Sequence, residues 1–83
     1  MAKSLYSERH KRLVAAIADQ RRAKGWSQAE LASAVSSTRH QSYIAKIESG
    51  QRRIDLVELL KIAGIIGLDV HALIDQLAAI PEE

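Results

Sequence analysis

The stretch Ser27–Gly50, SQAELASAVSSTRHQSYIAKIESG, decides the fold because it contains two short amphipathic segments joined by a polar turn. Ser27 and Glu30 form the S-x-x-E pattern of a capping box, which marks where the first segment begins. The apolar side chains of this segment share one helical face; they are Leu31, Ala32 and Val35. The run Ser-Ser-Thr at 36–38 then favours a turn, because these side chains bond to their own backbone.

The second segment, residues 41–49, places Ile44 and Ile47 on one side of a helix and polar side chains on the others. Gly50 follows as a helix stop. A short helix, a turn and a second helix with an outer face of amides and cations is the pattern of a DNA-reading helix-turn-helix.

Three motifs carry a family resemblance, and their joint order and spacing make chance agreement improbable. They are Gly25-x-Ser27-Gln28-x-Glu30-Leu31-Ala32, Ile44-x-Lys46-Ile47-Glu48-x-Gly50, and Leu59-Leu60-x-Ile62-Ala63 with Gly67-Leu68-Asp69. Over roughly residues 13–74, the chain resembles the phage repressor and Cro-like (XRE-like) helix-turn-helix regulators. The resemblance implies an all-α fold, a compact five-helix bundle of the lambda repressor-like kind.

Length and composition predict one domain over residues 1–83, with 1–6 as a loose arm. The core must be aliphatic, because the chain has no Phe and one Trp. The chain has no Cys, no apolar run of membrane-spanning length and no signal-peptide pattern, so we expect a cytoplasmic protein with no membrane contact. Periodicity predicts helices over 7–24, 28–35, 41–49, 56–66 and 69–80, and no strand. Gly64, inside the fourth helix, is interpreted as a close helix–helix contact.

Charge is distributed unevenly along the chain. Residues 1–53 contain eleven Lys/Arg and four Asp/Glu, whereas residues 54–83 contain one Lys and six acids. The basic part predicts a surface for a polyanion, and the acidic end should stay away from it. The charge alone would also fit an ordinary solvated surface, or a nucleoid-type protein that binds DNA without sequence preference.

Nothing in the sequence indicates catalysis, a metal or a cofactor. His10, His40 and His71 are far apart, and none is spaced at i, i+4 from another His. No Gly-rich phosphate loop occurs. We therefore expect a protein that is not an enzyme.

Gln41 is the first candidate for base reading, because a Gln amide at the start of a recognition helix can pair with adenine N6 and N7. Ser42 and Lys46 follow on the same side, and Tyr43 is a candidate for a thymine methyl or a phosphate. Arg39 and His40 add base or phosphate contacts at the helix entrance. The turn at 36–39 is about two residues longer than is usual in the resembled family and has no Gly, which leaves the register of Arg39 and His40 open.

Backbone contacts are expected on both sides of the recognition helix. The resemblance implies that Gln28, at a helix N-terminus, clamps a phosphate. Arg52 and Arg53 follow the recognition helix and suit the neighbouring phosphates. The resemblance also implies a structural ion pair between Arg21 and Glu48.

These residues predict a sequence-specific double-stranded DNA-binding transcription regulator, a repressor acting as a homodimer on a palindromic operator. The alternative is an antitoxin-type module that binds a partner protein and uses DNA binding for autoregulation. The last helix separates the two, because its apolar stripe would pair with its own copy in the first case and with a foreign protein in the second. The stripe predicts a dimer interface that includes Leu73, Leu77 and Ile80.

Overall fold

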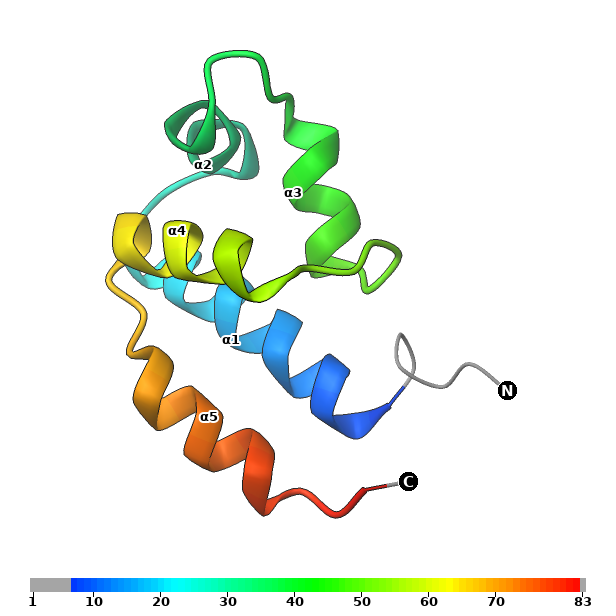
Figure 1. The fold of residues 1–83 in the computed structure, drawn as a ribbon. Coiled ribbons are helices and arrows are strands. Elements are labelled where there is room, and N and C mark those ends of the chain that lie inside the picture. The colour runs from blue at the N-terminus through cyan, green and yellow to red at the C-terminus, as the bar shows by residue number, and fades with distance from the viewer. Residues whose placement is uncertain (1–6, 83) are drawn as a thin grey trace.

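The computed structural model describes residues 7–82, which form five α-helices and no strand (Figure 1). The helices are α1 Glu8–Ala23, α2 Gln28–Val35, α3 Gln41–Glu48, α4 Leu56–Ile66 and α5 Val70–Ala79. This arrangement confirms the predicted all-α fold, and the helix limits agree with the sequence to within a residue or so. The predicted loose arm, residues 1–6, lies outside the described residues.

Side-chain caps explain where α2 and α4 begin. Ser27 Oγ accepts a hydrogen bond from the Glu30 backbone N–H at 3.0 Å, and Glu30 Oε1 accepts one from the Ser27 N–H at 2.8 Å. Asp55 and Glu58 make the same reciprocal pair at the start of α4. Each capping box satisfies backbone donors that the helix itself leaves unpaired.

The core is aliphatic and lies between α1, α2, α3 and α4. Its largest fully buried side chains are Ile17, Leu31, Ile44, Ile47, Ile62 and Ile66. Ile44 and Ile47 fix which side of α3 faces inward, so the opposite side of this helix is left for solvent. Burying each of these isoleucine side chains stabilises the fold by about 1.5–3 kcal/mol.

α5 packs antiparallel to α1, and the two helices lie side by side in Figure 1. Arg12 Nη2 donates to Gln76 Oε1 at 2.8 Å, and Arg9 Nε donates to the carbonyl of Ile80 at 2.9 Å. Leu73, one of the predicted dimer residues, is only 2% exposed within the protomer, whereas Ile74 is 48% exposed. Leu73 therefore does not belong to a dimer surface.

α4 leaves apolar side chains uncovered on its outer side. Leu56 and Leu60 are 61% and 53% exposed. Gly64 is exposed as well, and a Cβ built on it would meet nothing within 4 Å. The predicted close helix–helix contact at Gly64 is thus absent within the described chain. Within residues 7–82, no helix has the length and apolar character needed to cross a bilayer.

Candidate nucleic-acid interface

The turn between α2 and α3 is ordered by its own side chains. Ser36 Oγ lies 3.0 Å from Thr38 Oγ1 and accepts a hydrogen bond from the Thr38 N–H, and the Arg39 N–H donates to the Ser36 carbonyl. These bonds close the turn with no residue in the left-handed region, because Ser and Thr side chains substitute for backbone partners. His40 occupies the position before the first residue of α3 without a side-chain capping bond, and the helix begins at Gln41.

α3 presents polar side chains outward along its exposed side. Gln41, Ser42 and Lys46 are exposed, as are Arg39 and His40 just before the helix. Ile44 and Ile47 hold the opposite side in the core. The side chains proposed from the sequence as base-reading groups are therefore accessible to a ligand, with the exception of Tyr43.

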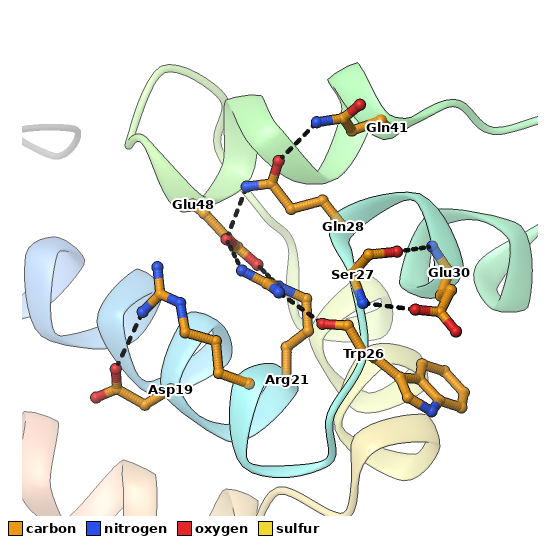
Figure 2. A network of polar contacts seen from close by, with 9 residues as sticks. Asp19, Arg21, Trp26, Ser27, Gln28, Glu30, Gln41 and Glu48 are labelled. Atoms are coloured by element: carbon orange, nitrogen blue, oxygen red, sulfur yellow. Dashed lines mark hydrogen bonds and ion pairs between the residues drawn. The ribbon is translucent and has the colours of Figure 1, made fainter.

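A chain of amides holds Gln41 in place (Figure 2). Gln41 Nε2 donates to Gln28 Oε1 at 3.2 Å, and Gln28 Nε2 donates to Glu48 Oε1 at 3.0 Å. Both the oxygen and the nitrogen of the Gln28 side-chain amide are thus bonded. The side-chain amide oxygen of Gln41 takes no part in these two hydrogen bonds. Such an arrangement restricts the rotamers of Gln41 before any ligand arrives.

The Arg21–Glu48 ion pair anchors this chain of amides. Arg21 Nε donates to Glu48 Oε2 at 2.7 Å and Nη2 donates to Oε1 at 3.0 Å, while Nη1 donates to the Trp26 carbonyl at 2.7 Å. Both side chains are more than nine-tenths buried. The bidentate geometry ties the end of α3 to α1 and to the loop before α2.

Burial alone would raise the pKa of the Glu48 carboxyl, but its hydrogen bonds from Arg21 and Gln28 outweigh burial and hold that pKa below its ordinary value. The same pair raises the pKa of the Arg21 guanidinium. Both groups are therefore charged at neutral pH. The buried carboxylate is a permanent acceptor for the Gln28 amide.

Tyr43 lies in the core instead of on the outer side of α3, a correction to the expected DNA contact. Its side chain is 7% exposed and its hydroxyl donates to Glu58 Oε2 at 2.7 Å. Burial, supported by this hydrogen bond, raises the pKa of Tyr43 to about 12. The aromatic ring of Tyr43 is large enough to reach from the first turn of α3 to α4. A prediction based only on the polar hydroxyl group therefore placed Tyr43 on the wrong side of α3.

The Tyr43 ring organises two cations of the proposed interface. The guanidinium carbon of Arg39 lies 4.3 Å from the ring centroid and that of Arg52 lies 5.0 Å from it. Together with Lys46, these arginines line a cleft of about 270 Å³. Among residues 7–82, neither Arg39 nor Lys46 pairs with a carboxylate, so these two residues give the cleft positive charge without an ion-pair partner.

Arg52 and Arg53 have different surroundings. Arg52 Nη2 pairs with Glu58 Oε2 at 3.1 Å and its side chain is 36% exposed, so it is held in place and only partly available. Arg53 is exposed and lies near His10 of α1. Burial of His10 is the main reason that the pKa of its imidazole is lowered, and the positive charge of Arg53 lowers it further. The two arginines thus have different neighbours, Glu58 of α4 for Arg52 and His10 of α1 for Arg53.

The family comparison agrees with this geometry. A family model described as helix-turn-helix matches residues 17–73. The chain belongs to this XRE-type helix-turn-helix family. It is a DNA-binding transcription regulator of that type. No curated protein and no solved structure matches the chain.

Glu58 is the residue of this regulator that sequence analysis did not connect to the interface. Its Oε1 accepts the Asp55 N–H in the capping box, while Oε2 accepts from both Tyr43 and Arg52. The capping pattern was visible in the sequence, but its second role depends on α4 lying beside α3. In the described part of the regulator, no group of three potential metal ligands comes together.

Proposed function

We propose that this regulator, as a single domain over residues 1–83, represses transcription by binding a palindromic double-stranded DNA operator as a homodimer. One observation carries the base-reading part of the proposal, namely that exposed Gln41 is held by a hydrogen-bonded chain running to a buried ion pair. A pre-oriented amide at the start of the recognition helix suits bidentate pairing with adenine.

Electrostatics supports contact with the phosphate backbone near the start of α3. Arg39, Lys46 and Arg52 line one cleft there. In the proposed complex these cations neutralise backbone phosphates, which fixes the position of α3 in the major groove without reading sequence. Ser42 and His40, both exposed, lie beside them and add contacts at the edge of the groove.

Gln28 has two proposed tasks. It lies at the first position of α2, where helix N–H groups favour a phosphate, and its amide already holds Gln41. The structural bond to Gln41 is therefore compatible with a phosphate contact made by the backbone at that helix end. Arg53 is proposed to contact a phosphate on the flank of the site.

Selection of bound sequences from a random double-stranded pool tests the proposal. We expect enrichment of two inverted half-sites about one helical turn apart, roughly 34 Å. The Gln41→Ala variant should lose preference at one base pair of each half-site while keeping the others. Enrichment of no sequence, with binding that depends only on salt, would show a DNA-coating protein and contradict the proposal. Enrichment of a single half-site without symmetry would retain base reading and contradict the homodimer.

A further inference from the structure

The outer side of α4 is a continuous apolar stripe. Leu56 is 61% exposed, Val57 77% and Leu60 53%. The inner side of the same helix supplies the core residues Leu59, Ile62, Ala63 and Ile66. Single exposed apolar side chains are ordinary, but three within five positions on one helix form a patch of the kind that marks interaction surfaces.

Gly64 lies on this stripe, one helical turn after Leu60. It occupies the interior of α4, where Gly costs helix stability relative to Ala. Its backbone does not require Gly, because its φ is not positive. Apart from its chain neighbours and the backbone of its own helix, no atom of residues 7–82 lies within 4 Å of the place a Cβ would take. The fold of the protomer therefore gives no reason for Gly here, and the missing side chain leaves a gap in the stripe.

We propose that a second copy of this chain covers the stripe in an antiparallel, two-fold pairing of α4 with α4 about Leu60. A two-fold interface uses the same patch on both copies, so the patch must supply both a projection and the recess that receives it. Leu56 and Gly64 lie four positions on either side of Leu60. In this register each Leu56 faces the Gly64 gap of the other copy, and the two Leu60 side chains meet at the axis.

Charge and position also favour a second copy as the occupant. The stripe is bordered by both an acid, Asp55, and a base, Lys61, which suits a self-complementary surface better than a nucleic acid. The N-terminal end of the stripe lies near the recognition helix, because Val57 lines one cleft together with Arg39 and Tyr43. A copy seated there brings its own recognition helix towards the same side, as two half-sites require.

α5 offers less for this purpose than the sequence suggested. Leu73 is buried in the protomer, Leu77 and Ile80 are partly buried, and Ile74 is the large apolar side chain that α5 leaves exposed. The inference therefore moves the dimer contact from α5 to α4. It rests on the proposed function for the homodimer and adds the surface and register of the pairing.

Sedimentation of the full chain over a range of concentrations tests the surface. Leu60→Glu places a charge at the axis, and we expect the dimer dissociation constant to rise at least about tenfold, because an unpaired charge is costly to bury. Ile74→Glu, a matched change on α5, should alter it less than about twofold. Circular dichroism verifies that both variants are folded. A wild type that stays monomeric at high micromolar concentration, or a dimer lost in Ile74→Glu and kept in Leu60→Glu, would overturn the inference.

Gly64→Gln tests the register. Gln is a better helix former than Gly, so the thermal midpoint of the dilute, monomeric protein should rise while dimerisation weakens. A higher midpoint with unchanged dimerisation would mean that no side chain enters the gap, and would overturn the register.

Binding of Leu60→Glu to a single half-site separates this inference from the proposed function. Retained sequence preference by the monomer, with loss of paired-site binding, supports both. Retained tight binding to paired sites overturns the α4 surface and leaves base reading intact. A dimer that the substitution disrupts, but that selects no DNA sequence, supports the surface and contradicts the proposed function.

Discussion

Two polar clusters hold α3, one on each side, and they differ in what they leave exposed. On one side the buried Arg21–Glu48 pair and Gln28 end at a neutral amide, Gln41. On the other, Tyr43 and Glu58 organise the cations Arg39 and Arg52. A neutral amide can discriminate bases but adds little to non-specific affinity, whereas cations do the reverse. We infer that this regulator separates sequence reading from backbone attachment on two sides of one short helix.

The largest expected effect is on stability, from breaking the buried ion pair. Glu48→Ala leaves the Arg21 guanidinium buried without its carboxylate, and the free energy of unfolding should fall by about 3–5 kcal/mol. Denaturant titration measures it. Asp19→Ala removes the partner of Arg22 in an exposed pair, with side chains 64% and 70% exposed, and should change stability by less than about 1 kcal/mol. Equal losses of unfolding free energy in the two variants would show that the buried ion pair contributes no more to stability than the exposed one.

Gln41→Ala should separate the two sides functionally. Binding to the selected operator should weaken by about 1–3 kcal/mol, because one base loses its bidentate partner. Binding to random DNA should hardly change, since the amide carries no charge. Competition titrations against both DNAs give the two values. The same loss on both would remove Gln41 from base reading.

Arg39→Ala should do the opposite. It weakens binding to operator and random DNA alike, and the slope of log K against log salt should become shallower by roughly 0.9 for the lost phosphate contact. Lys46→Ala provides a second measurement in the same cleft. A slope that stays the same in both variants would mean that the cleft does not face the backbone.

A smaller effect is expected on the stability of the fold at alkaline pH, through the hydroxyl group of Tyr43. The folded state raises the pKa of Tyr43 to about 12, above the ordinary value of 10.0. Its neutral hydroxyl therefore contributes stability that is fully present below pH 10 and is lost as pH rises towards 12. In Tyr43→Phe, stability measured between these values should depend less on pH. An unchanged dependence would assign the alkaline loss to other groups.

Patterns local in sequence predicted most of the fold. The capping box at Ser27 predicted the start of α2, and Ile44 with Ile47 predicted the register of α3, because each depends on neighbours a turn away. Which apolar residues stay outside could not be predicted. Leu56 and Leu60 have the composition of core residues, and their exposure depends on α5 packing against α1 and leaving the outer side of α4 uncovered.

The candidate site, like the fold, could be predicted from the sequence only in part. The exposed positions of Gln41, Ser42 and Lys46 follow from helical periodicity, but the position of Tyr43 does not. Its burial depends on Glu58, 15 positions away, as a hydrogen-bond partner. The Gln28–Gln41 hydrogen bond likewise joins residues on the two sides of the lengthened turn. No pattern in residues 36–40 predicts the path of the backbone through that turn.

The free-energy coupling between Gln28 and Gln41 tests the central claim most directly. Operator and random-DNA affinities of Gln28→Ala, Gln41→Ala and the double variant form a double-mutant cycle. If Gln28 holds Gln41 in its base-reading orientation, the double variant should lose less operator affinity than the two single losses added together, by about 0.5 kcal/mol or more. On random DNA the losses should add. Additive losses on the operator would contradict the account, because Gln41 would then read its base without the support of Gln28.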